Sequence, residues 1–305
     1  MYEHNPELIW WNGSVVPWDQ AQVHVTSETA LRGLNVFEGI RGYWDPASST
    51  LGLVQLDAHL RRLQDSADLL RIPAEGLAEQ VRQGIKELLA AIDPHHDVYL
   101  RPTLYVETGR YTAQRDTVTT GVFVACHRTD PRREEPVTCI TSSWRRIPDT
   151  ALPAMAKTGA AYTAFRMARL EALQAGADEA ILLNTHDQVA ETPGAAVFVV
   201  RDGQILTPPL ADGVLGSLTR SAVIRLAERD FGLTVAEQSL TRSELHTADE
   251  VFLTGTLDEV RLVASVDGHH RHPTASIAPL LRAAYLDMCT GQREPLDDGF
   301  AEVLA

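Results

Sequence analysis

The feature that most constrains the fold is a mixture of helix-like and strand-like segments with no repeated period. Apolar residues recur at helical spacing over residues 57–72 and 77–92, whereas residues 98–108 and 121–127 alternate as strands do. Further strand-like runs precede the helices, at residues 9–18, 23–27 and 51–56. This mixture predicts an α/β (α+β) fold for the first half of the chain.

The second half of the chain has the same mixed character. The sequence predicts a helix over residues 160–175 that ends at Gly176, and a hairpin turn at Asp202-Gly203. A second helix is expected after Gly216-Ser217. Strand-like runs cover residues 137–144, 178–185, 189–209 and 248–256.

A charged segment between the halves marks a possible domain boundary. Residues 128–136 (RTDPRREEP) contain two prolines and none of the large apolar residues. A chain of 305 residues suggests two domains, at about 150 residues per domain. We therefore expect a smaller N-terminal domain over residues 1–127, an interdomain loop, and a larger C-terminal domain over residues 137–305. The alternative is that the charged segment is an ordinary surface loop.

The charge balance argues against nucleic acid or an anionic membrane as a partner. The chain has 41 acidic and 27 basic side chains, which give a formal net charge of −14. It contains no apolar run of the ~18 residues that a membrane span needs, and its first residues lack the order of a signal peptide. Three cysteines without a CxxC pair fit a reducing compartment, so a cytoplasmic location is expected.

Lysine is rare, because the 27 basic residues are 25 arginines and two lysines, Lys86 and Lys157. Arginine cannot lose its proton in a protein, whereas lysine can act as a neutral amine nucleophile. Lys86 belongs to an amphipathic helix and is expected on its solvated face. Lys157 lies among small and apolar residues, where desolvation disfavours the ammonium form and suits a Schiff-base lysine. The alternative for Lys157 is a side chain that extends from a helix start into solvent.

Three further segments could hold parts of a cofactor with a phosphate and a ring. Gly216-Ser217-Leu218-Thr219 stands at a predicted helix start, whose backbone N–H groups favour an anion, and Thr254-Gly255-Thr256 is a second turn of small residues. Glu191, near a strand end, could face a protonated ring nitrogen. Each segment also has an ordinary interpretation, as a helix cap or an exposed turn. Together with Lys157 they suggest pyridoxal phosphate.

Eight motifs occur along the chain in an order typical of one enzyme family. They are IWWNGSVVPWDQAQVHVTS, NVFEGIRGY, HLRRLQDSA, YLRP, SSWRR, LPAMAKTGAAY, LTRSAVIRLA and ADEVFLTGTLDEV. On these motifs the chain resembles the class IV (fold type IV) pyridoxal-phosphate aminotransferases, and among them the bacterial branched-chain amino-acid aminotransferases. The resemblance covers nearly the whole chain. It implies two domains with the cofactor at their interface, and a homodimer.

The resemblance also implies a role for each matching residue. Lys157 would be the catalytic residue, binding the cofactor covalently and moving a proton. The remaining cofactor contacts would come from Arg62 on the phosphate, Tyr162 on the phenolic oxygen, Glu191 on the ring nitrogen, and Leu218, Thr219 and Thr256 around the phosphate. The substrate side would be lined by Phe37, Gly39, Tyr99, Arg101, Thr256 and Leu257.

The implied function is transfer of an amino group between an amino acid, branched-chain or related, and a 2-oxo acid such as 2-oxoglutarate, in amino-acid biosynthesis. Relatives on the same scaffold have other outcomes, and these remain alternatives. They are a 4-amino-4-deoxychorismate lyase, a D-amino-acid transaminase and an (R)-amine transaminase.

The chain departs from the family pattern in several places, of which Arg32 is the most informative. Arg32 stands where the family usually has a tyrosine, and residues 192–196 lack the usual Glu-Asn pair. Arg32 could contact a carboxylate or another polar group of the substrate, or could pair with a nearby acid such as Glu38. A metal is not expected, because His269-His270 and His272 lack further ligands at regular spacing.

Overall fold

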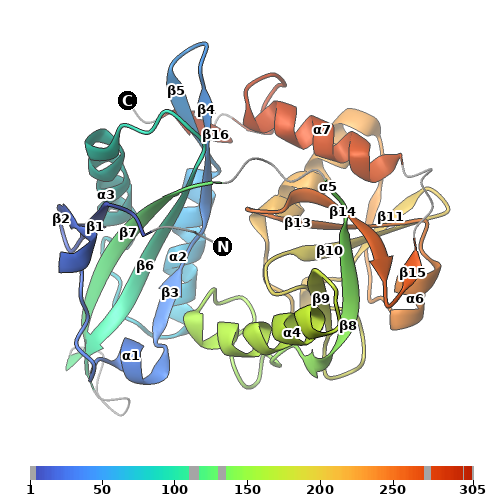
Figure 1. Cartoon of the computed structure of the whole chain (residues 1–305), viewed down its shortest axis with the longest axis horizontal. Helices are drawn as coiled ribbons and strands as arrows, with labels where there is room; N and C mark the ends of the chain where they lie inside the picture. Colours follow the sequence, from blue (N-terminus) through green and yellow to red (C-terminus); the bar gives the residue numbers. More distant parts are fainter. Residues whose placement is uncertain (1–4, 110–116, 130–134, 271–275, 298, 304–305) are drawn as a thin grey trace. The chain divides into compact units, whose positions relative to one another are not determined.

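The structure is a computed structural model that describes residues 5–109, 117–129, 135–270, 276–297 and 299–303. The chain divides into two compact units (Figure 1). Unit 1 comprises Met1–Pro131, Ala156–Ala160 and Asp297–Ala305, and unit 2 comprises Arg132–Met155 and Ala161–Leu296. Each unit has its own sheet and helices, so the fold is α/β with two sheets.

Unit 1 is built on an antiparallel sheet in the order β16-β5-β4-β6-β7-β1-β2, with β3 paired to β6. The long pair β6 and β7 lies at its centre and confirms the two strands expected from alternation. The strands are β1 (Leu8–Trp11), β2 (Ser14–Pro17), β3 (Asn35–Phe37), β4 (Ile40–Asp45), β5 (Thr50–Val54), β6 (Val98–Thr108), β7 (Thr119–Arg128) and β16 (Ala301–Val303).

Two amphipathic helices of unit 1, α2 (Leu56–Leu69) and α3 (Leu77–Ile92), confirm the predicted helices. Each buries one apolar stripe, for example Leu56, Leu60 and Leu63 on α2, in the core between helices and sheet. Gly84 lets α3 lie close to the sheet, since a Cβ there would come within 2.6 Å of the Trp10 ring. The short helices are η1 (Trp18–Gln20) and α1 (Glu28–Arg32).

Unit 2 contains a mixed sheet in the order β12-β11-β10-β13-β14-β8-β9, with β15 paired to β14. Asp202-Gly203 forms the predicted hairpin turn between β10 and β11, and both residues have positive φ, as a tight turn of this kind requires. The strands are β8 (Val137–Arg145), β9 (Glu179–Leu183), β10 (Ala196–Arg201), β11 (Gln204–Thr207), β12 (Val235–Glu237), β13 (Glu250–Gly255), β14 (Glu259–Val266) and β15 (His269–His270).

The helices of unit 2 pack on this sheet and confirm the two helices expected from the sequence. α4 packs on β8 and β9, while α5 and α7 pack together and on β13. Ser217 caps α5 by accepting a hydrogen bond from the Arg220 N–H, and Gly232 ends the helix in the left-handed conformation. The helices are η3 (Gly159–Ala161), which starts in unit 1, α4 (Tyr162–Gln174), η4 (Leu210–Asp212), α5 (Leu218–Phe231), α6 (Arg242–Thr247) and α7 (Ile277–Cys289).

The units are discontinuous in sequence, whereas the expected domains were continuous. Two segments from the expected C-terminal domain lie in unit 1, namely Ala156–Ala160 and Asp297–Ala305. The first is held by a β-bridge between Thr158 and Val36, and the second by pairing of β16 with β5. Backbone pairing across long sequence separations decides the membership of both segments. Residues 130–134 of the expected interdomain loop lie outside the described residues.

The strand expected at residues 23–27 is wrong. These residues form a turn that ends at Ser27, whose side chain accepts a hydrogen bond from the Ala30 N–H and caps α1. Val25 is 76 % exposed. The alternating pattern did not produce a strand, because Ser27 caps a helix and Val25 is exposed to solvent. Neither residue is paired or buried on a sheet, as a strand residue would be.

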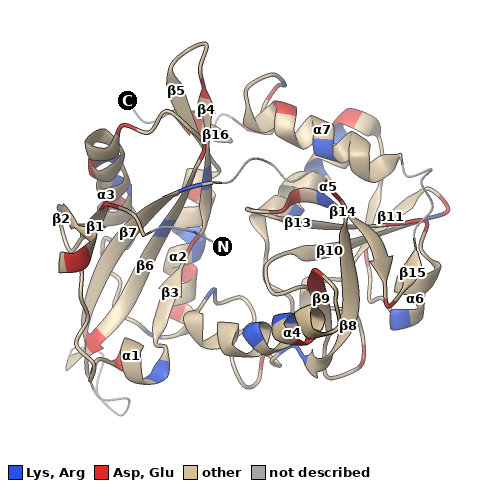
Figure 2. Cartoon of the chain, in the orientation of Figure 1, with Lys and Arg blue, Asp and Glu red and all other residues tan. Residues whose placement is uncertain are grey.

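Acidic and basic positions are interspersed on the elements of both units (Figure 2). This arrangement follows from the excess of acidic residues being spread over the chain. Each helix in the described part of the chain is too short or too polar to span a lipid bilayer.

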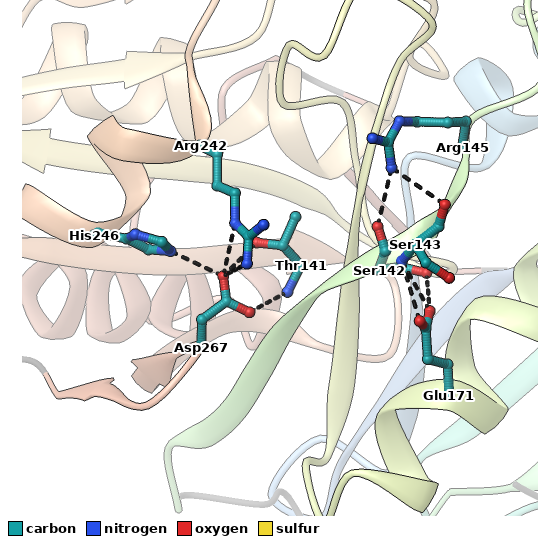
Figure 3. Close-up of polar contacts among 8 residues, drawn as sticks. All are labelled: Thr141, Ser142, Ser143, Arg145, Glu171, Arg242, His246 and Asp267. Atoms are coloured by element: carbon teal, nitrogen blue, oxygen red, sulfur yellow. Dashed lines mark hydrogen bonds and ion pairs between the residues drawn. The ribbon is translucent and has the colours of Figure 1, made fainter.

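Asp267 in unit 2 organises a polar cluster at the turn between β14 and β15 (Figure 3). Its carboxylate accepts hydrogen bonds from the Thr141 N–H at 2.7 Å, the Thr141 hydroxyl at 2.8 Å and the Arg242 guanidinium at 3.0 Å. The His246 Nε2 lies 2.8 Å from the same carboxylate. Burial opposes the charged form, but these contacts outweigh it and lower the pKa of Asp267 to about 2.

We expect Asp267→Asn to reduce the free energy of unfolding at pH 7 by about 1 kcal/mol, after allowance for screening by solvent. A carboxylate with a lowered pKa stabilises the fold above its unfolded pKa of about 3.9, and this contribution is lost as the pH falls toward about 2. Urea unfolding at pH 7 and pH 3 should therefore show a smaller difference between variant and wild type at pH 3. Asp202→Asn, at a side chain 93 % exposed, is the matched control and should show no such change. If Asp267→Asn reduced the free energy of unfolding equally at both pH values, the lowered pKa of Asp267 would be contradicted.

Candidate active site

Lys157 lies in unit 1, on a segment hydrogen-bonded to the residues around Phe37. The Phe37 N–H donates to the Lys157 carbonyl at 3.0 Å, and the Lys157 N–H donates to the Ser66 hydroxyl of α2 at 3.0 Å. The Lys157 Nζ lies 5.2 Å from the centroid of the Phe37 ring. Both backbone contacts fix the start of the side chain, so the amine is presented from an ordered segment and not from a free surface loop.

The Phe37 ring also carries the guanidinium of Arg101. The Arg101 Cζ lies 3.7 Å from the ring centroid, a cation–π distance. Tyr99 precedes Arg101 by two residues on β6 and is thus on the same face of the sheet. Its hydroxyl occupies the space that a side chain at Gly39 would need, which explains why a glycine stands there. Unit 1 therefore brings together Lys157, Phe37, Gly39, Tyr99 and Arg101.

Glu38 is the centre of a buried polar cluster beside Phe37. Its side chain has no exposed surface, and its carboxylate accepts hydrogen bonds from the Arg62 Nε and Nη2, each at 2.7 Å. The His59 Nδ1 lies 2.7 Å from the Glu38 Oε2, to which the Gly39 N–H also donates at 3.3 Å. His59 and Arg62 are three residues apart on α2, so they face the same carboxylate.

The charges of this cluster determine the pKa values within it. Burial would raise the pKa of Glu38, but Arg62 and then His59 outweigh it and hold the pKa well below its usual range. Burial lowers the pKa of His59 below its ordinary value, against the opposing effect of Glu38. The cluster is thus an ion pair between Glu38 and Arg62, with the histidine on one carboxylate oxygen.

Glu191 lies in unit 2 and is 6 % exposed. Its Oε1 accepts a hydrogen bond from the Arg146 Nε, and its Oε2 accepts one from the Leu215 N–H at 3.1 Å. Arg146 is itself 4 % exposed and also donates to the Ala154 carbonyl at 3.3 Å. A carboxylate has about four acceptor positions, so this anchored group can accept one more hydrogen bond.

The remaining predicted cofactor residues also lie in unit 2. Tyr162 begins α4 and packs edge-on against Phe165, with ring centroids 5.3 Å apart. Leu218 and Thr219 are the first two residues of α5, a helix of 14 residues. Thr256 and Leu257 lie in the hairpin turn between β13 and β14, where Leu257 is 50 % exposed.

Arg32 does not pair with Glu38, the partner that the sequence suggested. Its Nη1 lies 2.8 Å from both carboxylate oxygens of Glu28, one helical turn earlier on α1. The Arg32 side chain is 49 % exposed. Glu38 instead forms its ion pair with Arg62. The physical reason is burial, because the fully buried carboxylate pairs with an arginine that is only 11 % exposed, whereas the Arg32 side chain is half in solvent. Arg32 as a substrate contact stays a prediction.

Sequence reasoning missed the partners of both buried carboxylates. It considered Glu38 only as a possible partner of Arg32 and assigned no role to His59, although the His-x-x-Arg spacing on a predicted helix indicates two side chains on one face. It assigned none to Arg146, which follows Arg145 in the SSWRR motif. Neither pairing is local, because Arg146 and Glu191 are far apart in sequence, and so are Arg62 and Glu38.

Comparison with known proteins identifies the family. The sequence model described as "Amino-transferase class IV" matches residues 35–266, well over half of the chain. The chain belongs to the class IV aminotransferases.

This class IV aminotransferase is 32 % identical over 298 residues to the branched-chain-amino-acid aminotransferase of Escherichia coli, and the match covers 94 % of each chain. A solved branched-chain aminotransferase from Thermoproteus uzoniensis with norvaline has a TM-score of 0.90 and 33 % identity, covering 95 % of this chain and 96 % of that one. The PLP-form of the Thermobaculum terrenum enzyme has a TM-score of 0.89 and 36 % identity, with coverage of 95 % and 96 %.

The family fixes the general chemistry, which is pyridoxal-phosphate-dependent transamination, and the donor set of this aminotransferase fits that cofactor. A lysine amine is present for its aldehyde, and a buried carboxylate with spare acceptor capacity is present for its ring nitrogen. The Arg62 guanidinium, on a side chain 11 % exposed, and the backbone N–H groups at the start of α5 are of kinds that can bind a phosphate. Among the described residues, no group of three or more His, Cys, Asp or Glu could hold a metal ion; His272 lies outside them.

Proposed function

We propose that this class IV aminotransferase moves an amino group between an amino acid with an apolar side chain, branched-chain or related, and a 2-oxo acid such as 2-oxoglutarate. The observation that carries the proposal is the Phe37 ring, which has the Lys157 amine at 5.2 Å and the Arg101 guanidinium at 3.7 Å from its centroid. An apolar side chain can pack on such a ring, and a second carboxylate can pair with the arginine. One surface beside the nucleophile thus suits both kinds of substrate. The names of the similar enzymes support the branched-chain substrate class.

In this proposal the substrate side of unit 1 is formed by Phe37, Gly39, Tyr99 and Arg101. Thr256 and Leu257 of unit 2 are proposed to bind the α-carboxylate through their backbone N–H groups, which a hairpin turn can present to an anion. Their side chains are of secondary importance for this contact.

Each unit contains residues that we propose for cofactor contacts. Arg62 is proposed to pair with the phosphate, together with Leu218 and Thr219 at the start of α5 and Thr256 from its turn. Tyr162 is proposed to donate a hydrogen bond to the phenolic oxygen, and Glu191 to accept one from the ring nitrogen. Bound in this way, pyridoxal phosphate supplies an electron sink for the negative charge that develops when the substrate's α-carbon loses a proton.

The residues of the chain supply the proton transfer and the orientation. Lys157 is proposed to take the proton from the substrate's α-carbon with its neutral amine, and to return it later as a general acid. Glu191 holds a proton on the ring nitrogen, because its own position is fixed by Arg146 and the Leu215 N–H. Arg101 and Phe37 hold the substrate's side chain, so that the α-carbon faces the amine.

A panel of donors and acceptors tests the function. We expect leucine, isoleucine and valine to donate an amino group to 2-oxoglutarate, and the pyridoxamine form of the enzyme to appear after the donor alone. Release of pyruvate from 4-amino-4-deoxychorismate without amino transfer would instead favour the lyase. Turnover of D-amino acids or (R)-amines in preference to the L-amino acids would favour the other two relatives.

Substitution of Arg32 by tyrosine tests whether this residue sets substrate preference. Because Glu28 engages its guanidinium at 2.8 Å, we expect Arg32→Tyr to change the ratio of kcat/KM for leucine over glutamate by less than about twofold. The ratio is taken within each variant, so that losses of folded enzyme cancel. An increase of about tenfold or more would show that Arg32 contacts an anionic or polar group of the substrate.

We also propose that the enzyme is cytoplasmic, which the three cysteines without a CxxC pair support, and that it is a homodimer, as the family resemblance implies. Exposed apolar side chains in unit 1 support a protein partner, since Val25 is 76 % exposed and Leu31 58 % exposed. Both residues lie in the segment from residue 23 to α1 that also contains the Arg32–Glu28 pair. A second copy of the chain is the partner that the resemblance indicates.

A further inference from the structure

Glu38 is a buried charge that the proposed reaction does not use. It has no exposed surface, and its two oxygens accept three close contacts at 2.7 Å, two from Arg62 and one from His59. Removing a carboxylate from water costs several kcal/mol, a cost that only well-formed contacts offset. A neutral core residue would avoid this cost, so the position of the charge calls for a reason beyond packing.

The contact between Glu38 and Arg62 fixes the direction of the guanidinium. The carboxylate takes the Nε and Nη2 atoms, which form the side-on pair of donors of the planar guanidinium. The end-on pair, formed by Nη1 and Nη2, therefore points away from Glu38. A single acceptor would leave the guanidinium plane free to rotate, whereas the bidentate contact holds it.

His59 and the backbone of Gly39 hold the carboxylate itself. His59 is 3 % exposed and its Nδ1 lies 2.7 Å from the Glu38 Oε2, while the Gly39 N–H donates to the same oxygen. Glu38 also lies next to Phe37, whose N–H donates to the Lys157 carbonyl. One carboxylate thus connects α2, the substrate side of unit 1 and the lysine segment.

We propose that Glu38 is a positioning residue, which sets the direction of Arg62 so that its end-on donors bind the cofactor phosphate. This inference rests on the proposed function, in which Arg62 is the phosphate arginine. Glu38 acts through Arg62 and touches neither the substrate nor the cofactor. Its loss should therefore weaken recognition of the phosphate and leave recognition of the ring and the aldehyde unchanged.

The test compares binding of pyridoxal phosphate with binding of pyridoxal to the cofactor-free protein, by absorbance titration. Both aldehydes offer the same group to Lys157. The Kd of pyridoxal divided by the Kd of pyridoxal phosphate therefore measures what the phosphate contributes to binding. We expect Glu38→Gln to reduce this ratio about tenfold, the loss of roughly one charge-assisted hydrogen bond. Glu38→Asp, which keeps the charge but is too short to reach both nitrogens, should also reduce it. The matched control is Glu28→Gln, which removes the charge from another Arg–Glu pair of unit 1, Arg32–Glu28, and should leave the ratio unchanged.

A second comparison asks whether Glu38 acts through Arg62. In an Arg62→Lys background, which keeps a positive charge but has no side-on pair of donors, Glu38→Gln should change the ratio less than about twofold. An equal effect in both backgrounds would show a direct electrostatic effect and overturn the proposal. Equal weakening of both aldehydes by Glu38→Gln and Glu38→Asp would show a merely structural role and would also overturn it. Wild-type protein that binds pyridoxal as tightly as pyridoxal phosphate would contradict the proposed function itself.

Discussion

Lys157→Ala should abolish the near-visible absorbance that arises from the covalent linkage between the lysine and the cofactor, and should reduce turnover to less than about one thousandth of wild type. The alanine has no amine to bind the aldehyde or to move the proton of the substrate's α-carbon. The backbone contacts of residue 157 with Phe37 and Ser66 do not involve the side chain, so the variant should fold. Absorbance spectra of the reconstituted protein and a coupled assay with leucine and 2-oxoglutarate measure the two effects.

Lys86→Arg is the matched control, because Lys86 is the other lysine of the chain and lies on α3. Arginine keeps its positive charge and its helix propensity. Both the absorbance and the turnover of this variant should equal those of wild type. If Lys157→Ala instead retained normal turnover, the assignment of the cofactor lysine would be wrong.

Glu191→Gln should leave the cofactor bound but slow the proton-transfer step by roughly a hundredfold or more. A neutral amide cannot hold the ring nitrogen protonated, so the ring becomes a poorer electron sink. Both Arg146 and the Leu215 N–H donate to the native carboxylate. The N–H₂ group of the amide therefore faces one of these donors and cannot accept its hydrogen bond. Stopped-flow measurement of the half-reaction with leucine isolates this step from product release.

Glu171→Gln offers a matched control in the same unit. Glu171 also accepts hydrogen bonds from two neighbours, the Ser142 hydroxyl and the Ser143 N–H, but has no proposed contact with the cofactor (Figure 3). Its half-reaction should proceed at the wild-type rate. A wild-type rate for Glu191→Gln would mean that another acid holds the proton of the ring nitrogen.

The elements that the sequence predicted well are those specified by local physics. The helix at residues 77–92 has both an apolar stripe and clear ends, and the structure has it over the same residues. The strand at residues 98–108 is likewise confirmed, as is the Asp202-Gly203 turn. Periodicity and turn chemistry depend on neighbouring residues alone, so they can be evaluated without knowledge of the rest of the chain.

Pairings across long sequence distances could not be predicted in this way. The pattern at residues 23–27 resembled a strand, but a strand needs a neighbour, and none of the local signals says whether one is present. The ion-pair partners of Glu38 and Glu191 could not be predicted for the same reason. The sequence shows only that these residues are acidic, and does not show that they are buried or which side chain lies beside them. Lys157, Glu191 and the two turns that contain Leu218, Thr219 and Thr256 were singled out from residue chemistry, whereas the other candidate residues came from the family resemblance. The structure groups these residues within each unit without testing their roles.

The discontinuity of unit 1 has a consequence for the order of events during biosynthesis. When the ribosome has made residues 1–131, the nascent chain still lacks the lysine segment and the β16 edge strand, both of which unit 1 needs. At about 5–20 residues per second, the roughly 170 residues that follow take on the order of 10–30 s. During that time β5 has an unpaired edge, which is open to other nascent chains. Unit 1 can therefore reach its final form only after unit 2 has been synthesised, although most of its residues leave the ribosome first.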